Sequence, residues 1–327
     1  MKRWIAGLGA LLIAQIGLAV ALNMGGDRYT AFTPNEKLAA IEPAQVDTVL
    51  IETADKKVVL KKNDGKWQLP GQEGFPANQQ KVTQLLDTLA GLKKGWPVAT
   101  TAGAAKRFKV DEDEFERRIT LEHNGNRVAQ LYFGTSPGLR KVHARAVDQD
   151  DIVTVSFSLF DARADSNDWI DNKILNLDEK TIRRIDLPGL ALQKQDGRWQ
   201  VAELTADEET VTEQAENLVK KLSGLTVQSL FTAGEKPELE KDTKPLKIAV
   251  TLEGDNRLEY SFSKLKKSGY LLQRSDRPMQ FEVAEWEVDP IKETEREKLV
   301  RKRAPTEASD DNSKEEDKAG NTSEGNE

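Results

Sequence analysis

The most constraining feature of this chain is an internal repeat. Apolar residues and the turn residues beside them recur in the same order in both halves, at a spacing that falls gradually from 136 to 129 residues. The matched segments are Lys37–Ile51 with Lys173–Leu187, Asp64–Leu69 with Asp196–Val201, Thr120–Val128 with Thr251–Leu258, and Ala144-Arg145 with Gln273-Arg274. A repeat of this length predicts two copies of one domain rather than the units of a solenoid.

Each copy has the same predicted order of elements. Alternating apolar residues predict three strands, with the hairpin signal Asn63-Asp64-Gly65 before the third strand of the first copy. A stripe at helical spacing then predicts one helix, at about 77–93 in the first copy. The stripes are Val82, Leu85, Leu86, Leu89 and Leu92, and Ala215, Leu218, Val219, Leu222 and Leu225. Four more strands are expected after each helix, which gives an α+β fold with one helix covering an antiparallel sheet.

One segment contrasts with an otherwise water-exposed composition. Residues 4–24 contain no charge, and a run of about 20 apolar residues spans a bilayer as a helix. Lys2 and Arg3 precede it, so the positive-inside rule places the bulk of the chain outside the cytoplasm. We therefore predict a single-pass protein of the inner (cytoplasmic) membrane with its bulk in the periplasm of a diderm bacterium. Cleavage after Ala21, at Ala19-Val20-Ala21, is the alternative, although the run exceeds a signal-peptide core.

The end of the chain differs in composition from the rest. Residues 304–327 hold eight acidic residues and two lysines, a net charge of −6, which leaves −1 of the total −7 for everything before them. The segment has no large apolar residue, so we predict a disordered acidic tail. A nearly neutral body offers no overall basic field of the kind that nucleic-acid binding normally demands, so we predict no nucleic-acid partner.

The predicted organisation follows from these signals. It comprises a cytoplasmic N-terminus (1–3), a transmembrane helix (4–24), a linker (25–36), repeat domain 1 (37–165), repeat domain 2 (170–290), a charged helix after Pro290 (291–303) and the acidic tail (304–327).

Two motifs invite a chemical interpretation. Trp67 and Trp199 occupy one position in the two copies, where paired sugar ligands are possible, but core packing beneath each helix is favoured. Residues 134–138 match the G-x-S-x-G nucleophile elbow, yet Pro137-Gly138 starts no helix and the downstream His143 falls in the next strand. We predict a hairpin loop there.

Metal chemistry has little support in the sequence. There is no cysteine, and His123 and His143 are the only histidines, without clustered ligand spacing. The acidic run 111–114 lacks the glycine of an EF-hand loop, and Asp148, Asp150 and Asp151 read as a similar turn. We therefore predict no catalytic, cofactor-binding or metal-binding residue and no cofactor.

Four segments carry a resemblance to a bacterial family, the domain of unknown function numbered 4340. They are Phe32-Thr33-Pro34 before Lys37-Leu38, Val46–Ile51, Asp64–Trp67 and Asp168-Trp169-Ile170-Asp171. Members of that family look like membrane-anchored proteins that are often found beside ABC transporters of the gliding-motility type. The resemblance implies a transport-accessory or envelope role and supplies no catalytic residue.

Two functions of different class remain. The first is a non-catalytic, membrane-anchored accessory or scaffold protein with protein partners in an ABC-transporter-type or other envelope complex. The second is an extracytoplasmic, carboxylate-dependent hydrolase acting on envelope polymers. A cleft with an acidic pair of raised pKa favours the enzyme, and a broad exposed apolar patch favours the scaffold.

Overall fold

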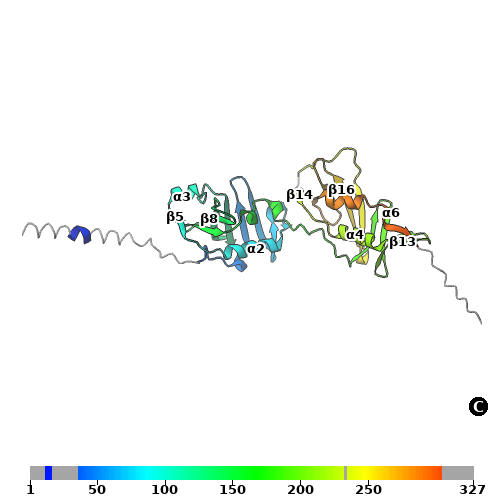
Figure 1. Ribbon diagram of the computed structural model, residues 1–327, viewed down its shortest axis with the longest axis horizontal. Coiled ribbons are helices and arrows are strands. Elements are labelled where there is room, and N and C mark those ends of the chain that lie inside the picture. The colour runs from blue at the N-terminus through cyan, green and yellow to red at the C-terminus, as the bar shows by residue number, and fades with distance from the viewer. Residues whose placement is uncertain (1–11, 17–35, 232–233, 304–327) are drawn as a thin grey trace, which may run out of the picture.

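Two antiparallel sheets organise the molecule (Figure 1). The structure is a computed structural model, and it describes residues 12–16, 36–231 and 234–303. The first sheet has the order β4 (Phe75–Pro76), β3 (Lys66–Leu69), β2 (Lys57–Asn63), β1 (Thr48–Glu52), β6 (Arg117–His123), β7 (Asn126–Phe133), β8 (Lys141–Ala146), β9 (Ile152–Ser156) and β5 (Pro97–Ala99). The second has the order β12 (Arg198–Val201), β11 (Leu190–Gln195), β10 (Ile182–Leu187), β15 (Leu246–Leu252), β16 (Arg257–Lys264), β17 (Tyr270–Arg274), β18 (Gln280–Val283) and β14 (Ser229–Phe231). The predicted α+β class with antiparallel sheet is confirmed.

Tight turns connect the neighbouring strands as the sequence predicts. Asp64 and Gly65 have φ values of 48° and 78° between β2 and β3, and Asp196 and Gly197 have values of 49° and 79° between β11 and β12. Two consecutive residues with positive φ define the two-residue hairpin turn whose twist matches that of the strands. The same type of Asp-Gly turn therefore precedes β3 and β12, the strands that carry Trp67 and Trp199.

Each sheet packs against one long helix. Helix α2 (Gln79–Ala90) begins at Asn78, whose side chain accepts a hydrogen bond of 3.0 Å from the Lys81 backbone N–H, and α4 (Thr212–Ser223) packs against β12. All ten residues of the two predicted stripes are buried, although Leu92 and Leu225 lie just beyond the helix ends. Trp67 and Trp199 are 4% and 6% exposed, so the prediction that both are core residues is confirmed.

The predicted charged helix at 291–303 is wrong in its bounds. Helix α5 spans Glu285–Lys292 with Pro290 inside it, and α6 (Arg296–Leu299) precedes a strand, β19 (Val300–Lys302), which pairs with β13 (Glu208–Thr210). The burial of Val288 and Ile291 explains why α5 forms although Pro290 removes one helical hydrogen bond. The strand depends on a partner about 90 residues away in the chain, which no local pattern shows.

The predicted correspondence of Arg145 with Arg274 is also wrong. Both arginines lie opposite a tyrosine, Tyr132 and Tyr260, in the neighbouring strand. Tyr260 belongs to the main core between sheet and helix, whereas Tyr132 belongs to a second apolar cluster on the opposite face of its sheet. Because alternate strand residues point to opposite faces, a correspondence shifted by one residue exchanges inside and outside.

The second apolar cluster includes residues from the stretch 97–116, for which the sequence predicts neither a helix nor a strand. Within the polar stretch 97–116 the chain forms β5 and a short helix, α3 (Ala102–Arg107), whose Ala104 and Ala105 are buried against Val110, Tyr132 and Ile152. This connection covers the outer face of the first sheet. Single 3-10 turns complete the fold, namely η2 (Pro43–Gln45), η3 (Pro70–Gln72), η4 (Leu159–Ala162), η5 (Ser166–Asp168) and η6 (Glu253–Asp255).

Besides the predicted cytoplasmic N-terminus, three predicted segments fall wholly or almost wholly outside the described residues. Of the predicted transmembrane helix 4–24, the structure describes only the helical residues 12–16, and nothing in the described parts of the chain is a helix with the length and apolarity to cross a bilayer. The predicted linker 25–36 is described only at Glu36, and the tail 304–327 not at all.

Candidate interaction site

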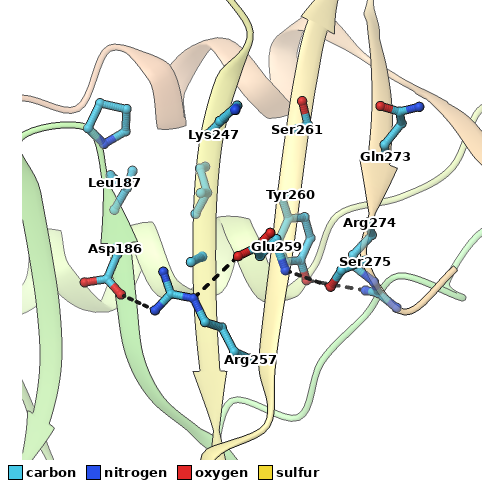
Figure 2. Close-up of a pocket in the computed structure, with 13 residues that line it drawn as sticks. Asp186, Leu187, Lys247, Arg257, Glu259, Tyr260, Ser261, Gln273, Arg274 and Ser275 are labelled. Carbon is cyan, nitrogen blue, oxygen red and sulfur yellow. Dashed lines mark hydrogen bonds and ion pairs between the residues drawn. The ribbon is translucent and has the colours of Figure 1, made fainter.

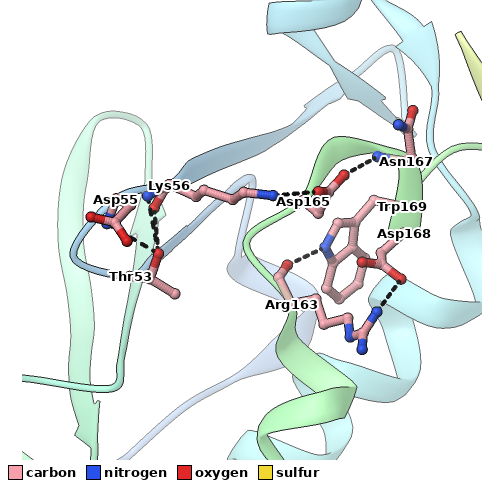
Figure 3. A network of polar contacts seen from close by, with 8 residues as sticks. All are labelled: Thr53, Asp55, Lys56, Arg163, Asp165, Asn167, Asp168 and Trp169. Carbon is pink, nitrogen blue, oxygen red and sulfur yellow. Dashed lines mark hydrogen bonds and ion pairs between the residues drawn. The ribbon is translucent and has the colours of Figure 1, made fainter.

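A buried tryptophan holds the connection between the two sheets. Trp169 is fully buried, and its indole N–H donates a 2.8 Å hydrogen bond to the Arg163 carbonyl oxygen (Figure 3). The Lys81 ammonium lies 4.9 Å from the ring centroid and donates to the Asp168 carbonyl oxygen at 2.6 Å. The segment 165–171, which the sequence analysis divides between the domains, is therefore attached to the first sheet and to α2.

Further contacts on either side of Trp169 attach the segment 165–171 to the first sheet. The Lys56 ammonium lies 2.8 Å from the Asp165 carboxylate, as Figure 3 shows, and the Asp171 N–H donates to the Pro76 carbonyl oxygen at 2.9 Å. One residue later the chain contacts the segment between α4 and β14 (Ser229–Phe231), because the Val227 N–H donates to the Asn172 carbonyl oxygen at 2.9 Å. A polar cavity of about 550 Å³ lies at this junction, lined by Asn78, Lys81, Asn167, Asp168, Ile170, Asn172, Thr226, Val227 and Gln228.

A larger open groove lies on the outer face of the second sheet. It has a volume of about 740 Å³ and crosses strands β10, β15, β16 and β17. Lys247, Ser261 and Gln273 form one row across three neighbouring strands (Figure 2). The adjacent row places Ala249 between Asp186 and Glu259, so a methyl side chain forms the floor between two carboxylates.

Charges of both signs surround the floor of the groove. The Arg257 guanidinium lies 3.5 Å from the Asp186 carboxylate and 3.8 Å from the Glu259 carboxylate, and these side chains are 54%, 27% and 72% exposed. Figure 2 shows this acid–base–acid arrangement along one edge of the groove. Exposed ion pairs contribute little to stability, typically 0–1 kcal/mol, so they remain free to exchange partners with an incoming surface.

A buried polar pair supports the same strands from the core side. The Arg274 guanidinium donates to the Leu175 carbonyl oxygen at 2.8 Å and to both Asp276 carboxylate oxygens at 2.6 and 3.0 Å. Burial pushes the pKa of Arg274 down, but the Asp276 hydrogen bonds and Tyr260 together raise it, so the net shift is upward. Burial raises the pKa of Tyr260. Arg274 is therefore a fixed positive charge, and it donates a 3.4 Å hydrogen bond to the neutral Tyr260 phenol. This contact holds β16 and β17 in register.

The residues of the G-x-S-x-G match form the predicted loop between β7 and β8. The Ser136 hydroxyl is within 2.8 Å of the Gly138 and 2.7 Å of the Lys141 carbonyl oxygens, to which it donates. The His143 ring contacts Phe108 at 4.3 Å between centroids, and its Nδ1 lies 2.9 Å from the Thr135 hydroxyl. The structure thus uses Ser136 to close a turn and His143 to pack the outer cluster, rather than bringing them together.

The other candidate ligands lie apart from one another. His123 lies 3.5 Å from the Asp47 carboxylate at the end of the first sheet. The acidic run closes on itself, since the Asp113 N–H donates to the Asp111 carboxylate at 3.2 Å. Among the residues that the structure describes, no group of three or more histidine or carboxylate side chains is placed to hold a metal ion.

The shifted carboxyl groups share one direction. Where the described residues include a carboxyl group with a shifted pKa, the pKa is lowered by a hydrogen bond: from the Asn124 backbone for Asp47, from Lys56 for Asp165, from Thr205 for Asp207, from Arg296 for Glu208 and from Lys264 for Glu285. A lowered pKa keeps a carboxylate ionised as an acceptor. These groups serve structural contacts.

Sequence reasoning missed the groove and the junction. The groove depends on the register that places Ala249 between two carboxylates on separate strands, and this register is long-range. Trp169 was recognisable as part of a family-like segment, but only the fold shows that it packs against α2.

Comparison with known proteins identifies the family. Residues 67–244, just over half of the chain, match the family model described as Domain of unknown function (DUF4340). The matched range runs from the buried tryptophan of β3 through the Trp169 junction and α4. No curated protein and no solved structure matches the chain. The chain therefore belongs to the DUF4340 family.

Proposed function

We propose that this chain is a membrane-anchored, extracytoplasmic accessory or scaffold protein. It does no chemistry of its own and serves an ABC-transporter-type or other envelope complex by holding a protein partner. The charge-free run 4–24 and its Lys2-Arg3 flank support a single anchor in the inner membrane with the bulk outside. The resemblance to proteins found beside transporters supports the choice of complex.

We also propose that the two sheets are duplicated domains. The first sheet has an additional edge strand, β4. Apart from it, both sheets run from the strand bearing the buried tryptophan through two hairpin strands, then through four consecutive strands, to a short strand that follows the helix. The shared order supports duplication, because unrelated domains have no reason to repeat it. If so, the two copies differ in the segments that cover the outer faces of their sheets.

The groove on the second sheet is the observation that carries the proposed function. In the first sheet, α3 and Phe108 cover the outer face around Tyr132. In the second sheet, the residues in the corresponding rows are Lys247, Ser261 and Gln273, and the face holds an open groove. An ordered face with charges of both signs and a shallow floor suits a protein surface of complementary charge.

A pair of charge reversals tests the proposed function. Arg257→Glu places a third negative charge between Asp186 and Glu259 in the groove, while Arg127→Glu makes the same change at an exposed arginine near the start of β7 in the first sheet. Both arginines are exposed strand residues, so both variants are expected to fold. We expect Arg257→Glu to abolish complementation of a deletion strain and Arg127→Glu to preserve it.

Crosslinking identifies what is lost. A photoreactive residue in place of Gln273, on an exposed position of the groove, should capture a membrane-associated partner that Arg257→Glu no longer captures. Equal complementation by both reversals would refute a docking role for the groove. A variant such as Glu259→Gln that folds and retains its partner but fails to complement would instead support the carboxylate-dependent hydrolase.

A further inference from the structure

The residues at the start of the first domain, 36 and 37, lie beside residues 93 and 94. The Lys94 N–H donates to the Glu36 carbonyl oxygen at 2.8 Å, and Lys37 and Lys93 form an isolated β-bridge. In Figure 1 the blue start of the body lies near β5, at the end of the molecule that also carries α3 and β8. The point where the N-terminal segment joins the body is thus defined by backbone hydrogen bonds.

A hairpin loop lies at the same end of the sheet. Lys141 is opposite Ser156 in the β8–β9 pair, and a side chain at Gly95 would approach the Thr154 carbonyl oxygen at 2.9 Å. The loop before Lys141 and the segment around Gly95 therefore flank the same end of β9. Neighbouring strands are about 4.8 Å apart, so the two segments are separated by roughly 10 Å.

These segments are basic and carry exposed apolar side chains. We call residues 36–37, 93–96 and 138–141 the basal surface. They contain five cationic residues (Lys37, Lys93, Lys94, Arg140 and Lys141) and one acidic residue, Glu36, although the body as a whole is nearly neutral. The Lys94 side chain is only 11% exposed and its ammonium lies 3.5 Å from the Glu36 carboxylate, so four exposed cationic residues remain for an anionic ligand. Leu139 is 92% exposed and Trp96 is 74% exposed.

We propose that the basal surface lies against the bilayer and binds anionic phospholipid headgroups. Basic residues are attracted to anionic lipid, and tryptophan and leucine enter the boundary between headgroups and acyl chains. Twelve residue steps separate Met24, the end of the charge-free run, from Glu36, which limits their separation to about 40 Å. The tether therefore keeps this surface close to the membrane, where a weak contact is enough.

The inference rests on the anchor in the proposed function and adds an orientation to it. With the first sheet's end on the membrane, the elongated body in Figure 1 carries the second sheet and its groove away from the bilayer. The groove would then face partners in the extracytoplasmic space rather than lipid.

The absence of cysteine makes a direct test possible. The full chain carrying Leu139→Cys or Leu239→Cys is labelled with a polarity-sensitive fluorophore and reconstituted into phosphatidylcholine vesicles with or without phosphatidylglycerol. Leu239, also an exposed leucine, lies in the second half of the chain and serves as the matched control. Spin-labelled lipid headgroups then report which fluorophore reaches the membrane surface.

We expect headgroup quenching at residue 139 but not at residue 239 in vesicles containing phosphatidylglycerol. Quenching should fall several-fold in pure phosphatidylcholine and in the charge-reversed chain with Lys93→Glu, Arg140→Glu and Lys141→Glu. A chain that floats with the vesicles but shows no quenching at residue 139, or quenching insensitive to charge, would overturn the basal contact and leave the anchor standing. A chain that does not float with the vesicles would overturn the anchor as well.

Discussion

Replacing Trp169 tests how the connection between the sheets is held. The indole is fully buried, donates to the Arg163 carbonyl oxygen at 2.8 Å and lies under the Lys81 ammonium at 4.9 Å. A buried tryptophan removes about 150–250 Å² from water, and about 25 cal/mol per Å² then corresponds to roughly 4–6 kcal/mol as an upper estimate. Partial collapse of the site reduces this, so we expect Trp169→Ala to lower the free energy of unfolding by about 3–5 kcal/mol.

Two further variants divide this effect into its parts. Trp169→Phe keeps an aromatic ring but leaves the Arg163 carbonyl oxygen without its donor, which should cost about 1–3 kcal/mol. Trp286→Ala removes a tryptophan from α5 that is 71% exposed, so we expect a change within about 0.5 kcal/mol. The three variants therefore predict a graded series rather than a uniform loss.

Urea denaturation followed by far-ultraviolet circular dichroism measures the series, with each transition fitted separately because the described residues form two large sheets. The loss should fall on the transition of the first sheet, to which Trp169 is attached. A Trp169→Ala variant that unfolds at the same urea concentration as Trp286→Ala would show that the indole contributes no net packing energy, and the argument for the junction would fail.

Short sequence patterns correctly predicted the helix and the hairpin turn that depend on residues close together in the chain. The stripe from Val82 to Leu89 and the turn Asp64-Gly65 each lie within a few residues, and the helix and the hairpin formed there as expected. Each tryptophan is the second residue after such a turn, and both Trp67 and Trp199 are buried as expected.

Long-range register decided the features that the sequence did not reveal. Strand β19 forms because Val300 pairs with Thr210, and a mixed run of charged residues gives no sign of such a partner. Arg145 and Arg274 look equivalent by spacing, yet a difference of one residue in register places them on opposite faces.

The groove also depends on long-range strand register, which the sequence does not reveal. Ala249 lies between Asp186 and Glu259 only because β10, from a distant part of the chain, aligns with the consecutive strands β15 and β16. Side chains on such a face are individually ordinary, so composition alone predicts a solvated sheet. A site of this kind is recognised from neighbouring strands and not from a motif.

Two further variants test local packing and charge. A side chain at Gly134 would overlap the Phe108 carbonyl oxygen, so Gly134→Ala should lower the free energy of unfolding in urea by about 1–3 kcal/mol. Gly103 faces open space within α3, so Gly103→Ala should raise the free energy of unfolding by about 0.5–1 kcal/mol. Equal effects of the two substitutions would contradict this prediction. Hydrogen bonds from Arg296 lower the pKa of Glu208 from 4.5 to about 2. Because the folded-state pKa is depressed, the stability contributed by Glu208 is present above the unfolded-state pKa and is lost as the pH falls from about 4.5 toward 2. Unfolding free energies of the parent and of Glu208→Gln should therefore differ at neutral pH and converge in acid, and a difference independent of pH would show that the carboxylate charge does not stabilise the β13–β19 pair.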